Sequence, residues 1–183
     1  DPAFIAELKG RNIGYIPTLT RDLSVFQYES TPDYINDPFF LRGLPAYASQ
    51  IDRVKDPALH AKIKANPGTA RAKQQFEQAL RNLKLMSDGG VMIAMGTDSG
   101  TGLGRWQGYF EQVEMELMVK AGMTPMRALV ASTGNAAKVM GLDGYGVEVG
   151  NPADFVLLQA RDPVEAIRLR ANRLMVVRRG RVV

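Results

Sequence analysis

The sequence predicts an α/β fold, because helical and strand-like segments alternate along the chain. Asp1-Pro2 precedes a short helical segment that Gly10 ends, so the N-cap, the first-turn proline and the terminal glycine are all present. Residues 13–19 then have the composition of a strand, with Pro17 near its end. Helix, short loop and strand in this order are typical of α/β proteins.

A second helix–strand unit follows further along the chain. Residues 70–87 carry apolar side chains at helical spacing, and Gly89-Gly90 ends this helix. Residues 91–95, Val-Met-Ile-Ala-Met, form an unbroken apolar run between turn signals. Such a run is typical of a parallel strand that is buried on both faces.

The segment between these units, residues 21–65, is rich in aromatic residues and prolines. We expect helices near residues 38–44 and 47–63, joined by irregular turns. A long structured insertion after a strand often forms a lid or a wall of a binding site. Simple packing against the outside of the domain is an equally good interpretation.

The last third of the chain changes from helical to strand-like character near residue 145. The spacing predicts helices at residues 110–121, 126–131 and 135–140, strands at 153–158 and 173–178, and a hairpin turn at Arg179-Gly180. We therefore divide the chain into an α/β part, residues 1–145, and a small all-β part, residues 146–183.

Composition narrows the classes of function. Apolar residues make up 45% and charged residues 23%, as in soluble globular proteins, and no apolar run is long enough to span a membrane. The absence of cysteine excludes disulfides, thiolate metal sites and Cys nucleophiles, and the single histidine, His60, excludes a site built on two histidines of this chain. The net charge of +4 is small for a nucleic-acid binder, so we expect neither a nucleic-acid nor a membrane partner.

The two ends of the sequence suggest a segment of a larger protein. The chain opens on Asp1 rather than Met and stops on the apolar pair Val182-Val183. We expect a soluble protein with further residues before this segment, with the cytoplasm slightly favoured as its location.

Asp98 is the most informative single residue. It comes directly after the predicted strand 91–95, within Gly-Thr-Asp-Ser-Gly at residues 96–100. The carboxyl ends of parallel strands carry ligand and catalytic groups in α/β folds. A carboxylate there can bind a metal or accept a proton. An Asx-turn or a loop cap is the alternative interpretation, and the two are about equally favoured.

The loop after Asp98 is rich in glycine, with five glycines between residues 96 and 108. It has neither the Gly-Lys-Ser/Thr of a P-loop nor a dinucleotide-binding pattern. Gly102 would let the backbone approach a substrate closely. Arg105 could hold an anionic substrate group or pair with a nearby acid, and Trp106 could line the pocket. A solvated Arg105 and a core Trp106 are equally good interpretations.

Two further features carry weaker signals. His60 lies in a helical segment without a partner motif, which favours a surface or half-buried side chain. Seven arginines lie between Arg161 and Arg181, and this density permits a phosphate-binding surface. Arginines that alternate with apolar residues also describe the solvent face of a small sheet, and we prefer that interpretation.

Four blocks in the second half of the chain resemble the metal-dependent amidohydrolase superfamily, in particular its imidazolonepropionase-like and dipeptidase-like members. They lie at residues 96–100, 121–129, 133–142 and 146–158, and include Ala-Gly-Met-Thr-Pro at 121–125 and Gly-Asn-Pro-Ala-Asp at 150–154. Their order and spacing extend the resemblance over about residues 91–183.

The resemblance implies the last part of a distorted (β/α)₈ barrel and part of a small β-sandwich. Residues 13–19 would be the seventh barrel strand and residues 91–95 the eighth, while residues 146–183 would belong to the sandwich. Asp98 matches the family's aspartate, which binds the catalytic metal and takes the proton from the attacking water. The implied cofactor is one or two divalent ions, with zinc expected.

The resemblance also implies what this segment lacks. The family's His-x-His pair and its remaining metal ligands belong to earlier strands, so this segment would hold one ligand and be inactive alone. Its partners would be the missing N-terminal part, a small-molecule substrate and a second copy in a homo-oligomer.

Two functions follow as hypotheses. The first is a metal-dependent hydrolase of C–N bonds in a small amide, cyclic amide or dipeptide-like substrate, with Asp98 as metal ligand and proton acceptor. Arg105, Gly102 and Trp106 would contact the substrate. The alternative is a non-catalytic domain that binds anions or nucleotides through the glycine-rich loop and the arginine-rich tail.

Overall fold

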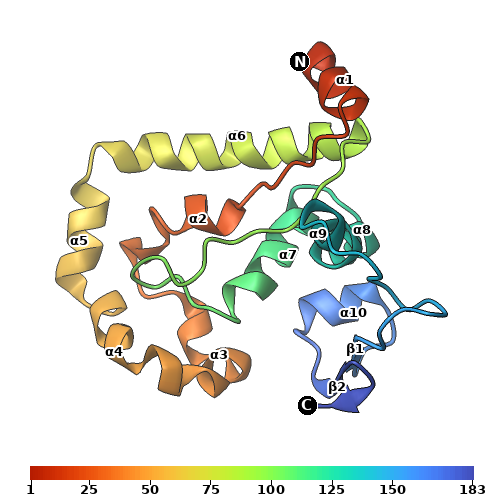
Figure 1. The fold of residues 1–183 in the computed structure, drawn as a ribbon. Coiled ribbons are helices and arrows are strands. Elements are labelled where there is room, and N and C mark those ends of the chain that lie inside the picture. Colours follow the sequence, from red (N-terminus) through yellow and green to blue (C-terminus); the bar gives the residue numbers. More distant parts are fainter.

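The computed structural model describes all of residues 1–183, as a helical body with a small sheet at its C-terminal end (Figure 1). The α-helices are α1 (Pro2–Gly10), α2 (Leu19–Leu23), α3 (Pro38–Arg42), α4 (Leu44–Val54), α5 (Pro57–Ala65), α6 (Gly68–Asp88), α7 (Phe110–Lys120), α8 (Pro125–Ser132), α9 (Gly134–Val139) and α10 (Pro163–Arg168). Two 3₁₀ turns, η1 (Gln27–Glu29) and η2 (Asp33–Asn36), precede α3, and the strands are β1 (Phe155–Leu158), β2 (Arg173–Arg178) and β3 (Arg181–Val182).

Five of the ten α-helices begin with the same local signal, a side-chain N-cap followed by proline. In each, the cap oxygen accepts a hydrogen bond from a backbone N–H of the first turn. Proline at the next position needs no hydrogen bond there and has the φ of a helix already. The caps are Asp1, Asp37, Asp56, Thr124 and Asp162.

Most of the predicted helices are confirmed, and one is divided. The predicted helix at 47–63 is two helices, α4 and α5, because Pro57 cannot continue the helix before it and Asp56 caps a new one. The structure adds the short helix α2 and the 3₁₀ turns η1 and η2, which no periodic pattern indicated.

The predicted strands at residues 13–19 and 91–95 are wrong in extent. The two segments do lie parallel, but they share a single bridge between Tyr15 and Ile93. The Tyr15 N–H donates to Met92 O at 2.9 Å, and Ala94 N–H donates to Tyr15 O at 3.0 Å. Beyond this bridge, the Met95 N–H bonds to Ala131 O of α8, so no further strand extends the ladder.

The C-terminal sheet has the order β1-β2-β3, with both pairs antiparallel. The predicted strands and the turn at Arg179-Gly180 are confirmed. The prediction of an all-β part is wrong, because α10 lies between β1 and β2 and packs against α7 and α8. Asp162 caps this helix and Pro163 opens it, and its buried Ile167 joins the main core.

Two buried clusters hold the helical body together. The larger joins α6, α7 and α8 to the parallel segments, with Leu83, Ile93 and Met118 among its members. The second is aromatic and lies where η1, η2, α3 and α4 meet the start of α7. None of the helices has both the length and the apolar character needed to cross a membrane.

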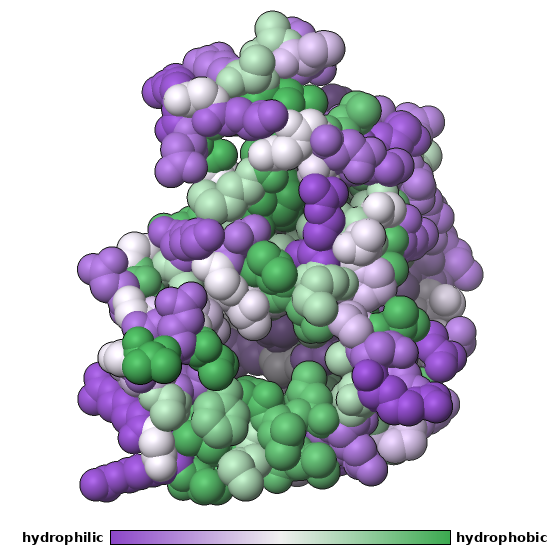
Figure 2. Space-filling view, turned by 90° about the vertical axis from the view of Figure 1, so that its right-hand side faces the viewer, coloured by the Kyte–Doolittle hydropathy of each residue, from purple (hydrophilic) through white to green (hydrophobic).

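The C-terminal sheet leaves apolar side chains open to solvent. Phe155, Val156 and Leu157 of β1 and Leu174 of β2 are all exposed. Figure 2 shows hydrophobic residues gathered in the lower part of the view, at the end of the molecule that carries this sheet. A sheet face of this kind is one that another layer of protein normally covers.

Phe40 is the centre of the aromatic cluster, and Phe40→Ala should destabilise the fold strongly. Its ring is fully buried and packs with four other rings, whose centroids lie 5.1–5.4 Å away: Tyr34, Tyr47, Trp106 and Tyr109. We expect the free energy of unfolding to fall by roughly 3–5 kcal/mol, measured by urea denaturation. Phe4→Ala is the control, since Phe4 is 49% exposed, and its cost should stay below about 1 kcal/mol. Equal losses for the two variants would contradict this prediction.

Candidate functional site

The two parallel segments end side by side, and each ends in a residue with left-handed backbone geometry. Thr18 has φ 50° and Asp98 has φ 52°. This conformation costs a non-glycine residue roughly 1–2 kcal/mol, although aspartate tolerates it better than most. Strained residues of this kind gather at functional sites because the surrounding structure holds them there.

Asp98 presents a free carboxylate at the end of the second parallel segment. The side chain is exposed and has no hydrogen bond or ion pair with any other residue. Only its backbone oxygen is engaged, as the acceptor for the Thr101 hydroxyl at 2.7 Å. The predicted site residue is therefore open to a ligand.

The residues of this chain do not form a metal site by themselves. No group of three or more His, Asp or Glu side chains converges anywhere in the structure. His60 lies on α5, and its ring nitrogen bonds to the backbone oxygen of Val54 at 2.8 Å. An ion at Asp98 would therefore need ligands that these residues do not supply.

The loop at residues 98–108 is held by its own backbone N–H groups. Gly100 N–H donates to Arg105 O at 2.7 Å, and Gly104 N–H donates to Gln50 Oε1 at 2.8 Å. Gly104 has φ 68°, and a side chain there would overlap the ring of Tyr28, whose hydroxyl bonds to the Gly104 oxygen. These glycine amides are paired inside the protein and do not face an anion.

Glu111 of α7 ties the two ends of this loop together. Its Oε1 accepts hydrogen bonds from the hydroxyls of Ser99, at 2.5 Å, and Thr97, at 3.2 Å. Its Oε2 accepts the Gly108 N–H at 2.7 Å. One side chain thus fixes the residues on both sides of Asp98.

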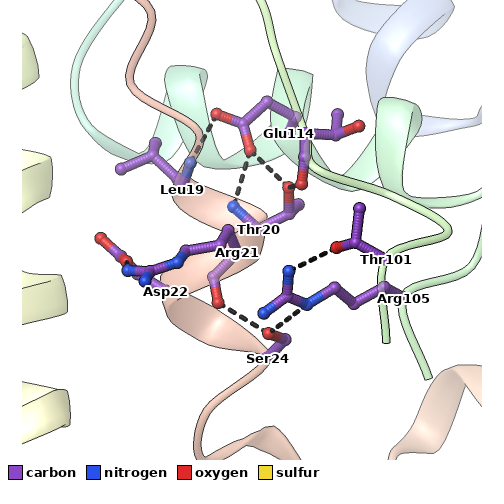
Figure 3. A network of polar contacts seen from close by, with 9 residues as sticks. Leu19, Thr20, Arg21, Asp22, Ser24, Thr101, Arg105 and Glu114 are labelled. Carbon is purple, nitrogen blue, oxygen red and sulfur yellow. Dashed lines mark hydrogen bonds and ion pairs between the residues drawn. The ribbon is translucent and has the colours of Figure 1, made fainter. Parts of the chain in front are cut away.

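Arg105 is half-buried and bonds to hydroxyl groups rather than to an acid (Figure 3). Its Nε donates to Ser24 Oγ at 3.1 Å and its Nη1 donates to Thr101 Oγ1 at 2.7 Å. The predicted pairing with a nearby acid is wrong, because Arg105 has no ion pair in the structure. Its positive charge has no protein counter-ion.

Gly102 and Trp106 lie in different surroundings. Gly102 is exposed near the tip of the loop, where its oxygen accepts the Arg105 N–H at 3.2 Å. The Trp106 ring is 1% exposed, packs in the aromatic cluster and donates its Nε1–H to the Tyr34 hydroxyl at 3.0 Å. Trp106 therefore anchors the loop from inside the protein.

The sequence prediction missed Glu114, which is fully buried on α7. Its Oε1 accepts the Leu19 N–H at 2.8 Å, and its Oε2 accepts the Thr20 N–H at 2.7 Å and lies 2.8 Å from the Thr20 hydroxyl (Figure 3). Burial raises the pKa of Glu114 to about 7, while these hydrogen bonds act in the opposite direction. Glu114 lies between Phe110 and Leu117 on the apolar face of α7. A charged residue on an apolar helix face is the sequence pattern that could have identified Glu114.

Comparison with known proteins identifies the family. The sequence profile of the amidohydrolase family matches residues 46–183. The chain belongs to the amidohydrolase family. It is 35% identical, over 74 residues, to N-isopropylammelide isopropyl amidohydrolase of Pseudomonas sp. (strain ADP), a match that covers 40% of this chain and 18% of that protein.

Two solved structures share the fold of this amidohydrolase chain. One is a Xaa-Pro dipeptidase with bound methionine in its active site, at a TM-score of 0.63 and 20% identity, with 100% of this chain and 37% of that chain covered. The other is molinate hydrolase, at a TM-score of 0.56 and 21% identity, with 98% of this chain and 34% of that chain covered. The chain thus spans well under half of the length of these relatives.

Glu114→Gln should remove a pH dependence from the stability of the protein. Because the folded pKa lies near 7 rather than at the ordinary 4.5, folded Glu114 binds a proton that the unfolded chain has released between these values. Its stabilising contribution is complete below about pH 4.5 and is lost as the pH rises through about 7. Between these limits, the free energy of unfolding should fall by roughly 3 kcal/mol relative to the Gln variant.

This prediction is measured by urea denaturation at a series of pH values. Glu7→Gln, a change on the exposed surface of α1, is the control and should keep the wild-type profile. A Glu114→Gln profile parallel to that of the wild type would refute the prediction.

Proposed function

We propose that the complete protein is a metal-dependent hydrolase of C–N bonds in a small amide, cyclic amide or dipeptide-like substrate. The single observation that carries this is the free Asp98 carboxylate, exposed at the end of a buried segment and held in a left-handed conformation. Membership of the amidohydrolase family supports the reaction class.

The placement of the chain within the complete protein is part of the proposal. Residues 13–19 and 91–95 would be the last two strands of a (β/α)₈ barrel, and residues 146–183 would contribute to a small β-sandwich. Their parallel bridge and the exposed apolar sheet support this placement. The other metal ligands would come from residues outside this chain, so we expect the 183 residues alone to be inactive.

Asp98 would act on protons at its carboxylate oxygens. It would accept a proton from the attacking water and return it to the nitrogen of the leaving group. A bound divalent ion, for which zinc is our expectation, would polarise the carbonyl group of the substrate. Arg105 would meet a negatively charged group of the substrate, since its charge has no counter-ion in the protein.

The alternative of an anion-binding domain receives less support. Phosphate loops direct free backbone N–H groups at the ligand. Here Gly100, Gly104 and Gly108 already donate to acceptors within the protein. The glycine-rich loop is therefore better suited to placing Asp98 and Arg105 than to cradling a phosphate.

Asp98→Ala in the complete protein tests the central claim. We expect bound zinc to fall below one equivalent and hydrolysis of an amide panel to fall by at least about 10²-fold, because a ligand and a proton acceptor are lost together. Asp143→Ala, on an exposed turn, is the matched control and should leave both quantities unchanged. Full metal content and full activity in the Asp98 variant would overturn the proposal.

Arg105→Ala tests the substrate-binding role. Loss of a charged hydrogen bond worth roughly 1.5–3 kcal/mol should raise KM for an anionic substrate by about 10- to 100-fold. The KM for a neutral analogue of the same size should change far less. The measurement is steady-state kinetics with both substrates. An equal change in KM for the two would assign Arg105 a purely structural role.

A further inference from the structure

The Thr20 hydroxyl faces two acceptors with one proton. Its Oγ1 lies 3.1 Å from the backbone oxygen of Thr97 and 2.8 Å from Glu114 Oε2, and Thr20 is fully buried. A carbonyl oxygen and an ionised carboxylate both accept hydrogen bonds and cannot donate them. With Glu114 ionised, Thr20 can therefore satisfy only one of its two neighbours.

Protonation of Glu114 removes this conflict. Glu114 Oε2–H can then donate to Thr20 Oγ1, and the Thr20 hydroxyl is free to donate to Thr97 O. The two oxygens of Glu114 still accept the N–H groups of Leu19 and Thr20. Since buried polar groups are almost always paired, the neutral acid is the form that the geometry fits.

We propose that Glu114 is a positioning residue that, in its protonated form, holds the Thr97–Asp98 peptide in place through the Thr20 hydroxyl. The effect on turnover rests on the proposed function, whereas the effect on the peptide does not. Ionised Glu114 takes the Thr20 proton for itself, because a charge-assisted hydrogen bond is stronger than one to a neutral carbonyl.

The peptide in question sets the direction of the Asp98 side chain. The Thr97 oxygen belongs to the peptide group that leads into Asp98, whose φ is 52°. Glu111 holds the hydroxyls of Thr97 and Ser99 from the other side. Without the hydrogen bond from the Thr20 hydroxyl, the Thr97 oxygen loses its partner on one side of this peptide. The left-handed backbone of Asp98 is then restrained by fewer contacts.

The surroundings of Glu114 keep its proton affinity high. Asp22 of α2 raises the pKa of Glu114 further. Tyr15 is the other titratable neighbour, and its own pKa is raised by burial and, to a smaller extent, by Asp22 and Glu114. Several charged side chains of the helices packed on α7 have partners of their own: Arg21 with Asp22, Lys73 with Glu29, Lys84 with Asp88, Arg127 with Ser87 and Glu165 with Arg161. Arg71, Glu77 and Arg81 of α6 and Arg168 of α10 make no hydrogen bond or ion pair with Glu114. Arg105 bonds to Ser24 and Thr101 (Figure 3). Glu114 itself has no ion pair, and no cation is among the groups that shift its pKa.

Hydrogen exchange in the complete protein tests the positioning directly. Peptides that span residues 96–102 are followed from pH 5.5 to 8.5, with rates corrected for the intrinsic chemistry of exchange. In the wild type the corrected rate should rise about fivefold as Glu114 ionises near pH 7. Thr20→Val should exchange fast at every pH, Thr20→Ser should match the wild type, and Glu114→Gln should show no step.

The matched control is Glu116→Gln on the same helix. Glu116 is half-buried, pairs with Arg170 and has no contact with Thr20. This variant should keep the wild-type step. A wild-type step that survives in Thr20→Val, or an equal loss of the step in Glu116→Gln, would overturn the proposal.

Turnover gives the second readout. Thr20→Val should lower kcat about tenfold while KM stays within about twofold, and Thr20→Ser should restore kcat. An unchanged kcat in Thr20→Val, in a protein that Asp98→Ala inactivates, would overturn the positioning role. If the wild type hydrolyses no amide, the proposed function fails instead, and hydrogen exchange alone decides the positioning.

Discussion

Two carboxyl groups on one helix, Glu114 buried and Glu111 half-buried, constrain the whole site. Glu111 and Glu114 lie on successive turns of α7 and face the ends of the two parallel segments. A buried carboxyl group without donors is costly, so the chain must bring N–H or O–H groups to it. The start of α2 does this for Glu114, and the loop after residue 97 does it for Glu111. Thr18 and Asp98 lie next to the residues that make these hydrogen bonds, so the two carboxyl groups fix their positions.

Helices were predicted well wherever a local signal defines them. A cap, a proline and a periodic apolar face act within a few residues, so α1, α6, α7 and α8 could be located from the sequence alone. Asp162-Pro163 carries the same signal, and reading it in the same way would have located α10. The strands were overestimated because pairing depends on a neighbour: residues 13–19 have the composition of a strand but meet a partner at Tyr15 alone.

The candidate site was predictable only in part, for the same reason. Asp98 was found because it directly follows an apolar run, which is a local pattern. The partners of Arg105 lie at Ser24 and Thr101, and those of Trp106 lie in η2, α3 and α4, so both environments depend on the folding of the region between 21 and 54. Composition indicated a structured region there, either a lid or wall of a binding site or a layer packed on the domain, without specifying what it would contact.

Trp106 gives the protein an internal optical probe. It is the single tryptophan of the chain, its ring is buried, and its indole N–H has one partner, the Tyr34 hydroxyl. Fluorescence excited at the red edge of the absorption band therefore comes from one environment, at the buried end of the loop that also carries Asp98 and Arg105. If the loop moved out of the aromatic cluster, water would reach the indole ring and its emission maximum would shift to longer wavelength. The emission maximum of the protein therefore reports whether Trp106 is packed in the cluster.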